Sequence, residues 1–138
     1  HEKGLDKSKV NITEALRVDL EGDGAEEYVL CAMTTTPGYI GDGLGNTAAK
    51  IGDYSLAMVV KEADGKTIPI LLAGLFHRTA DDLSIAVEYT IDGVFDVDGD
   101  GIQEVAVCSY STEEIHANAV YRVGDLSAME IMGVFYGP

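Results

Sequence analysis

The chain has 138 residues, with 9 Lys and Arg against 24 Asp and Glu, which gives a formal net charge of −15 at pH 7. This length allows one domain with a real core, or two small repeats packed together. The acidic balance argues against nucleic acid and anionic membranes as partners and favours cations or cationic surfaces. No apolar run approaches the length of a membrane span. The opening HEKGLDKSKV lacks an initiator Met and a signal-peptide pattern, so we expect a trimmed or processed end.

The first half of the chain predicts four short strands rich in β-branched and aromatic residues and separated by turn residues. They lie near Val10–Val18, Glu27–Met33, Tyr54–Lys61 and Thr67–Phe76, and the segment EADGK forms the hairpin turn between the last two. Pro69 lacks an amide hydrogen, so the strand TIPILL is expected at the edge of a sheet.

A long loop, TTTPGYIGDGLGNTAAKIGD (Thr34–Asp53), interrupts this half. Its alternating glycines suggest a phosphate cradle, but the loop lacks a GK[ST] ending and a following helix. Long loops on β scaffolds often carry binding residues, and Tyr39, Asp42 and Asn46 could contact a sugar or a peptide. An ordinary insertion is the alternative interpretation.

The second half predicts four more strands, near Ile85–Phe95, Glu104–Tyr110, Ala117–Val123 and Ala128–Tyr136, with VGDLS as a hairpin turn. The second strand of each half is apolar at nearly every position: YVLCAM in one and VAVCSY in the other. A strand with one solvated face should alternate, so both strands are expected to be covered on both sides.

An internal repeat relates the two halves. VDLEGDGAEEYVLCAM aligns without a gap with FDVDGDGIQEVAVCSY, so that Asp19 matches Asp96 and Cys31 matches Cys108, an offset of 77 residues. The equivalent cysteines could form a bridge across a twofold axis. Inner strands of separate sheets rarely bring two Cα atoms within bonding range, so two buried free thiols are expected instead.

The spacing of oxygen donors, which the two copies of the repeated segment share, predicts two calcium loops. Each loop places side-chain oxygens at positions 1, 3, 5 and 9, a glycine at 6 that permits the reversal, and a backbone carbonyl at 7. An EF-hand is excluded because position 12 is apolar in both copies, and a solvated acidic turn is the alternative. The expected ligands are Asp96, Asp98, Asp100, Ile102 (carbonyl) and Glu104 in the second loop, and Asp19, Glu21, Asp23, Ala25 (carbonyl) and Glu27 in the first.

These two stretches resemble the DxDGDGxxD/E calcium loop of FG-GAP/VCBS-type repeats, known from integrin α-subunit propellers and many secreted bacterial proteins. The resemblance implies a structural Ca²⁺ between the first two strands of each propeller blade, hence two ions. The chain departs from the family pattern in three respects: no Gly-Ala-Pro follows either loop, position 3 of the first loop is Glu21, and two blades are too few to close a propeller.

The sequence therefore predicts an all-β fold, with residues 1–138 forming a single domain of two four-stranded antiparallel repeats (about 10–76 and 85–136). Propeller-blade-like sheets with pseudo-twofold symmetry are expected to pack as a sandwich or barrel. A fragment of a longer propeller and a ring completed by oligomerisation are the other two possibilities.

Function is expected to be non-enzymatic. The three histidines are scattered, no HExxH or GxSxG pattern is present, and the clustered acids are explained by a cation. The main hypothesis is a calcium-stabilised β module of a secreted, cell-surface or periplasmic protein engaged in adhesion or ligand binding, since extracellular modules bind Ca²⁺ only at about 10⁻⁴–10⁻³ M. The alternative is an accessory glycan-binding domain of a secreted hydrolase.

Overall fold

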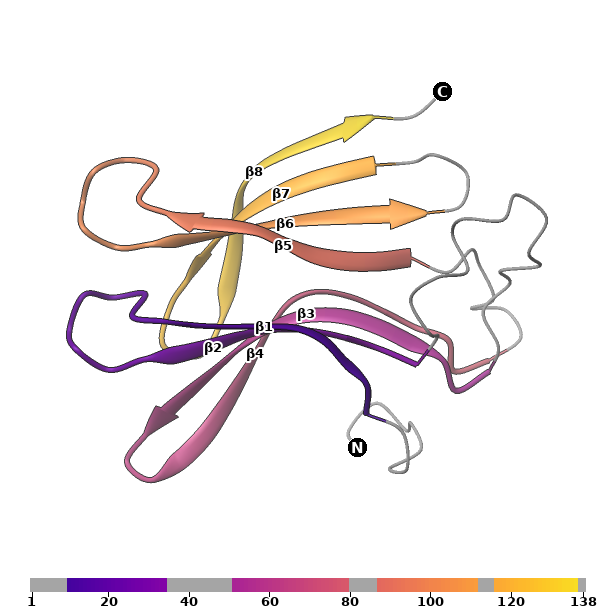
Figure 1. The fold of residues 1–138 in the computed structure, drawn as a ribbon, viewed down its shortest axis with the longest axis horizontal. Helices are drawn as coiled ribbons and strands as arrows, with labels where there is room; N and C mark the ends of the chain where they lie inside the picture. Colours follow the sequence, from indigo (N-terminus) through magenta and orange to yellow (C-terminus); the bar gives the residue numbers. More distant parts are fainter. Residues whose placement is uncertain (1–9, 35–50, 80–86, 112–115, 137–138) are drawn as a thin grey trace.

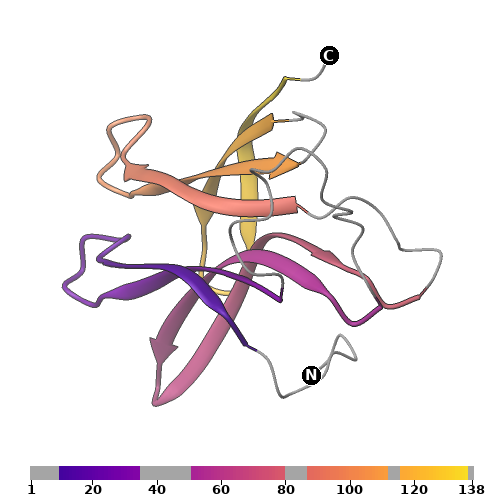
Figure 2. The ribbon, with the colours of Figure 1, turned by 45° about the vertical axis from the view of Figure 1, so that its right-hand side comes forward.

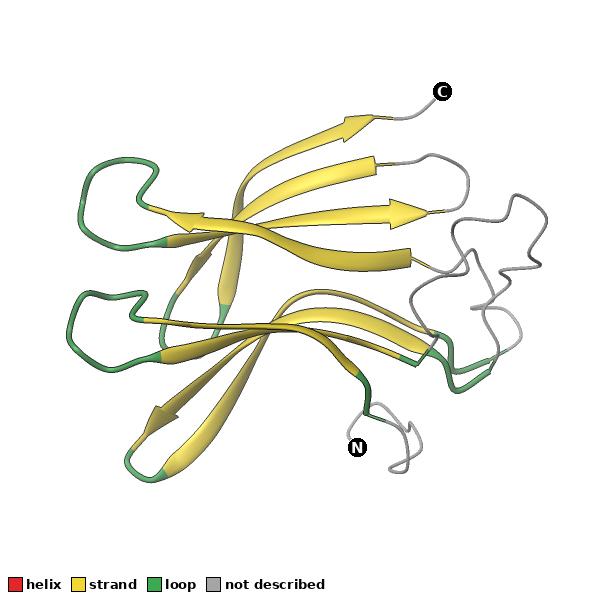
Figure 3. Ribbon diagram, viewed as in Figure 1, coloured by secondary structure: helices red, strands yellow, loops and turns green. Residues whose placement is uncertain are grey.

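The computed structural model describes residues 10–34, 51–79, 87–111 and 116–136. These residues form eight strands in two four-stranded antiparallel sheets, and none of them is helical (Figure 3). Within the same ranges there is accordingly no helix long and apolar enough to cross a membrane. The all-β prediction with two four-stranded sheets packed together is confirmed.

Both sheets are meanders in which each strand pairs with its neighbour in the sequence (Figure 1). Wherever the predicted strand ends fall on described residues, the observed ends agree to within two residues. Sheet 1 contains β1 (Ile12–Val18), β2 (Glu27–Met33), β3 (Tyr54–Ala63) and β4 (Lys66–Phe76), and sheet 2 contains β5 (Val87–Phe95), β6 (Glu104–Ser111), β7 (His116–Val123) and β8 (Ala128–Tyr136).

Local turn chemistry fixes the hairpins at the ends of β3 and β7. Asp64 and Gly65 both have positive φ angles, 53° and 69°, as the two central residues of a type I′ turn require. In the second hairpin, the Gly124 amide donates to the Ser127 carbonyl at 2.8 Å. Pro69 lies in β4, which is the edge strand of sheet 1, as its missing amide donor predicts.

The two sheets share one hydrophobic core, but equivalent residues of the two repeats do not meet in it. We call face A the side of either sheet that bears Val29 or its equivalent Ala106, and face B the opposite side. The core takes face A from sheet 1, with Val29, Cys31, Ala57, Val59 and Ile70. It takes face B from sheet 2, with Val105, Val107 and Tyr121.

The repeats are therefore stacked face to back. A twofold axis between the sheets would bring the same face of each repeat into the core, whereas the observed core combines face A with face B. The consequence is visible at equivalent positions: Val105 is 0% exposed and its equivalent Tyr28 is 44% exposed. Among the described residues the other sheet thus covers only face A of β2 and only face B of β6, so neither inner strand has a sheet on both sides, contrary to the expectation.

The face-to-back stack places the two acidic loops side by side at one end of the molecule (Figures 1 and 2). The Gln103 amide of the second loop donates to the Leu20 carbonyl of the first at 2.7 Å. The Leu20 side chain is 1% exposed and belongs to the shared core. The first loop is therefore anchored in the contact between the sheets, and the second loop is tied to it.

Candidate metal site and adjoining features

The second acidic loop (residues 96–104) is organised around the carboxylate of Asp96. Its Oδ1 accepts hydrogen bonds from the amides of Gly99 and Asp100, at 2.6 and 3.1 Å, and its Oδ2 accepts one from Gly101 at 2.8 Å. The chain can wrap one carboxylate this tightly because Gly99 and Gly101 have φ angles of 81° and 90°, which side chains other than glycine rarely adopt. The loop is thus shaped by its own backbone donors.

This geometry gathers three predicted ligands. One carboxylate oxygen from each of Asp96, Asp98 and Asp100 lies within 4.8 Å of the others, so these residues could hold a metal ion. Among the described residues they are the group of acids that meets this condition. The amide of Ile102, whose carbonyl is a predicted ligand, donates to Asp100 Oδ1 at 2.9 Å and closes the turn.

Glu104 lies at the base of the loop, where β6 begins, and its side chain is fully buried. Its Oε2 accepts the Val97 amide at 2.9 Å, while its Oε1 accepts hydrogen bonds from Nε and a terminal nitrogen of Arg122. The same guanidinium donates to Asp98 Oδ2 at 2.8 Å and lies 3.4 Å from Asp100 Oδ2. A positive charge from β7 thus already neutralises part of this acidic loop.

The charges at this site reinforce one another. The hydrogen bond from Arg122 is the main reason why the pKa of Asp98 is lowered. Conversely, the hydrogen bonds to Glu104 and Asp98 raise the pKa of Arg122. The ionised form of Asp98 and the charged form of Arg122 therefore stabilise each other.

The first acidic loop (residues 19–27) repeats the backbone pattern. Asp19 accepts the amides of Gly22, Asp23 and Gly24 at 2.7, 3.2 and 2.8 Å, and the pKa of Asp19 is lowered, most strongly by the Gly24 amide. The Ala25 amide donates to Asp23 Oδ1 at 2.8 Å.

The side chains of the first loop do not form an equivalent cluster. Glu21 turns to the ammonium of Lys61, with which it forms an ion pair, and the buried Glu27 accepts the Leu20 amide at 2.9 Å. The longer Glu at position 3 reaches the buried Lys61, and the first loop is not among the groups of described acids whose oxygens lie within 4.8 Å of one another. An ion in the first loop stays a prediction.

The sequence reasoning missed the two cations, Lys61 and Arg122. They occupy equivalent positions, because Val60 pairs with Tyr28 in sheet 1 and Tyr121 pairs with Val105 in sheet 2. Tyr28 and Val105 directly follow the glutamates that end the two loops, Glu27 and Glu104. The same register therefore places Lys61 opposite Glu27 and Arg122 opposite Glu104. The chain has only nine Lys and Arg residues, and one of them occupies the same position on the third strand of each repeat. This match was the sequence signal that could have identified both cations.

Both cysteines are free and buried, as expected. Burial raises the pKa of the Cys31 thiol to about 12 and also raises that of Cys108, so both thiols are protonated at neutral pH. The proposed ligand residues Tyr39, Asp42 and Asn46 lie outside the described residues.

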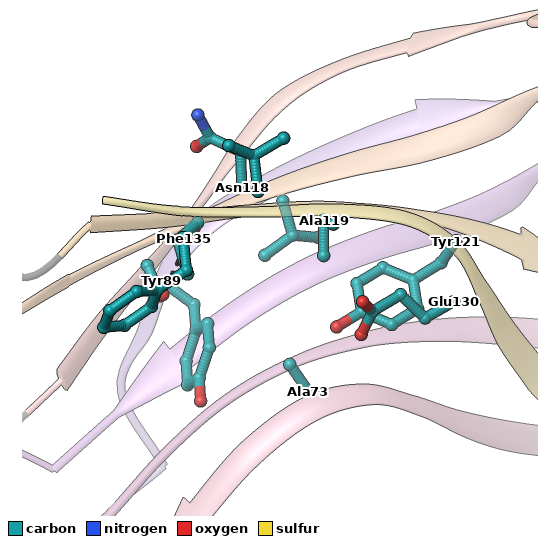
Figure 4. Close-up of a pocket in the computed structure, with 12 residues that line it drawn as sticks. Ala73, Tyr89, Asn118, Ala119, Tyr121, Glu130 and Phe135 are labelled. Atoms are coloured by element: carbon teal, nitrogen blue, oxygen red, sulfur yellow. Dashed lines mark hydrogen bonds between the residues drawn. The ribbon is translucent and has the colours of Figure 1, made fainter. Parts of the chain in front are cut away.

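A cavity of about 390 Å³ is lined almost entirely by residues of sheet 2, with Ala73 of β4 as the lining residue from sheet 1 (Figure 4). The carboxylate of Glu130 lies beside the ring of Tyr121 and over Gly133, where a Cβ atom would collide with it. Burial raises the pKa of Tyr89 to about 12, so its hydroxyl stays protonated. The lining residues that matter chemically are Tyr89, Ser109, Tyr121, Glu130 and Phe135, with Ala73 opposite.

Comparisons of the chain with protein-family models, with curated proteins and with solved structures found no match in any of the three. Function must therefore be argued from the two loops, their cations and the cavity.

Proposed function

We propose that the chain is a calcium-stabilised, non-enzymatic β module of a secreted or cell-surface protein, in which the second acidic loop holds the ion. The observation that supports this most is the approach of the Asp96, Asp98 and Asp100 oxygens to within 4.8 Å of one another. Oxygens that each lie about 2.3–2.6 Å from one Ca²⁺ can be at most about 5 Å apart, so this spacing fits a shared ion.

The donor set favours calcium over other divalent ions. The loop offers only oxygen ligands, which suit hard cations, and it offers them from a flexible surface turn instead of a rigid octahedral cage. The carbonyl of Ile102 at position 7 is the further donor that the spacing supplies, while Glu104 at position 9 holds Arg122 and the Val97 amide at the base of the loop. The formal charge of −15 concentrates cations around the whole molecule and adds to the attraction.

Arg122 sets the affinity in this proposal. Its guanidinium contacts one oxygen each of Asp98 and Asp100, so it competes for both carboxylates with an ion and repels that ion. This competition subtracts from the affinity and places binding in the weak range of extracellular modules, about 10⁻⁴–10⁻³ M. Calcium-rich compartments would saturate such a site, which is the reason for proposing an exported protein.

Thermal unfolding followed by circular dichroism tests the calcium site. At Ca²⁺ ten times above the dissociation constant, the native state should gain about 1.4 kcal/mol relative to protein in EDTA, which corresponds to a melting temperature about 4 °C higher. Mg²⁺ should not reproduce the shift. The variant Arg122→Met should melt lower than the wild type in EDTA, because Glu104 loses its partner, yet should show a larger response to Ca²⁺.

Matched variants locate the ion. Asp98→Asn combined with Asp100→Asn should abolish the calcium response, whereas Glu21→Gln combined with Asp23→Asn in the first loop should leave it in place. An unchanged melting temperature of the wild type at millimolar Ca²⁺ would reject the proposal, and so would a response that disappears only with the first-loop variant.

The cavity favours one second candidate, glycan binding. Aromatic rings beside a carboxylate and a serine hydroxyl combine an apolar surface with fixed polar groups, as ligand sites of this volume commonly do. The substitutions Glu130→Gln and Tyr89→Phe change only these polar atoms. Either should weaken binding of any glycan that the wild-type protein retains on an array, while Leu126→Gln on the exposed β7–β8 turn should not. A blank array for the wild type would eliminate this candidate.

A further inference from the structure

The face-to-back stack leaves one face of each sheet without a partner from the other sheet. In sheet 1 this is face B, and in sheet 2 it is face A. Among the described residues the middle of each of these surfaces is apolar: face B of sheet 1 presents Tyr28, Leu30, Met58 and Val60, and face A of sheet 2 presents Ala106, Val120, Met132 and Val134. Polar groups lie beside this middle on face A of sheet 2, namely Asn118 and the Glu104–Arg122 pair.

These two uncovered surfaces are the same pair of faces that already meet inside the chain. The cross-strand partners establish the equivalence. On face B, Leu30 pairs with Met58 in sheet 1, and Val107 pairs with Ala119 in sheet 2. On face A, Val59 pairs with Ile70 in sheet 1, and Val120 pairs with Met132 in sheet 2. Face A of one repeat packs on face B of the other within the molecule. A second copy therefore offers each uncovered surface the kind of partner that the chain itself uses.

We infer that face B of sheet 1 is covered by face A of sheet 2 from a second copy of this chain. The contact is heterologous, because a different surface is used on each side. A pair of copies therefore retains one free face of each kind, one on each copy, and further copies can add. Such a contact closes into a ring if the rotation between copies permits and otherwise gives an open filament.

Exposure at equivalent positions supports this assignment. Leu20, at the contact between the sheets, is 1% exposed, and its equivalent Val97 is 40% exposed. The edge strand β8 is exposed on both faces, with Met132 at 53% and Val134 at 44% on face A and Phe135 at 68% on face B, so the assignment rests on the comparison of Leu20 with Val97. Clusters of large exposed apolar side chains on one sheet face are typical of interaction surfaces, whereas scattered single ones are ordinary.

The backbone offers a matching polar contact. Inside the chain, the Gln103 amide donates to the Leu20 carbonyl. The equivalent groups, the amide of Glu26 and the carbonyl of Val97, make no backbone hydrogen bond with another described residue outside the strand ladders. In the inferred contact these two groups, from neighbouring copies, form the same bond.

Sedimentation velocity of the full chain tests the inference. The wild-type protein should associate progressively from micromolar to submillimolar concentration, in buffer of physiological ionic strength because the charge of −15 otherwise keeps copies apart. Tyr28→Glu blocks face B of sheet 1, and Met132→Glu blocks face A of sheet 2. Each variant alone should remain monomeric, whereas an equimolar mixture of the two should form a heterodimer and nothing larger.

The matched control is Leu126→Glu, which adds the same charge at a 77% exposed turn position and should associate like the wild type. Circular dichroism checks that each variant is folded, and Met58→Lys replaces Tyr28→Glu if that variant unfolds. A wild-type protein that stays monomeric at every concentration would overturn the inference. A Met132→Glu variant that still self-associates would also overturn it, because the contact would then join two copies of the same face.

Discussion

Replacing Leu20 with alanine should lower the free energy of unfolding by about 2–5 kcal/mol, the range for truncating a buried leucine. Leu20 is 1% exposed although it stands inside an acidic turn, between Asp19 and Glu21. Its side chain belongs to the core shared by both sheets, its amide donates to Glu27, and its carbonyl accepts the Gln103 amide. Truncation leaves a cavity at the point where the first loop, the core and the second loop meet.

The repeat supplies the control for this prediction. Val97 is the equivalent residue of the second loop and is 40% exposed, so Val97→Ala should change stability by only about 0.5 kcal/mol. Urea unfolding of both variants gives the comparison, provided that the slope against denaturant is unchanged. Similar losses for the two variants would contradict the face-to-back packing, because a twofold arrangement would bury both positions alike.

Replacing Glu104 with alanine should cost about 3 kcal/mol. The side chain is fully buried and accepts hydrogen bonds from the Val97 amide and from Arg122. Its loss leaves the Val97 amide unpaired and removes the buried partner of a guanidinium. The cost stays below that of breaking a fully enclosed ion pair, because Arg122 is partly exposed and retains Asp98 and Asp100.

The conservative variant separates charge from hydrogen bonding. Glu104→Gln keeps an acceptor for the Val97 amide and loses the negative charge, so its cost should fall to about 1–2 kcal/mol. Glu27→Gln in the first loop should cost less again, since Lys61 forms its ion pair with Glu21 there. Chemical denaturation in EDTA is the measurement. Equal effects of Glu104→Gln and Glu27→Gln would show that Arg122 adds nothing to the buried carboxylate.

Sequence reasoning succeeded where the physics is local. Segments rich in β-branched and aromatic residues predicted the strands, and the Asp64–Gly65 pair predicted the hairpin, because backbone preference and neighbouring residues decide both. The acidic loop was also predictable from spacing alone, since Asp96 binds amides only three to five residues ahead of it.

The missed features depend on contacts between distant segments. Arg122 reaches Glu104 across a strand pair, so its role follows from register and cannot be seen in the loop motif. The choice of face A or face B for the core depends on how one sheet sits on the other. The sequence of β2 alone does not predict that Val29 is buried and Tyr28 is exposed, because both residue types are common in strands.

The strict chain order of both meanders has a consequence for how the molecule folds. Every strand pair joins sequence neighbours, and no strand crosses from one sheet to the other. Each sheet can therefore assemble from pairs of neighbouring strands, although β2 and β3 are separated by the long segment Thr34–Asp53. The docking of one sheet on the other joins the most distant parts of the chain. Mutations in the shared core should therefore mainly accelerate unfolding, and those in the β3–β4 and β7–β8 hairpins should slow folding.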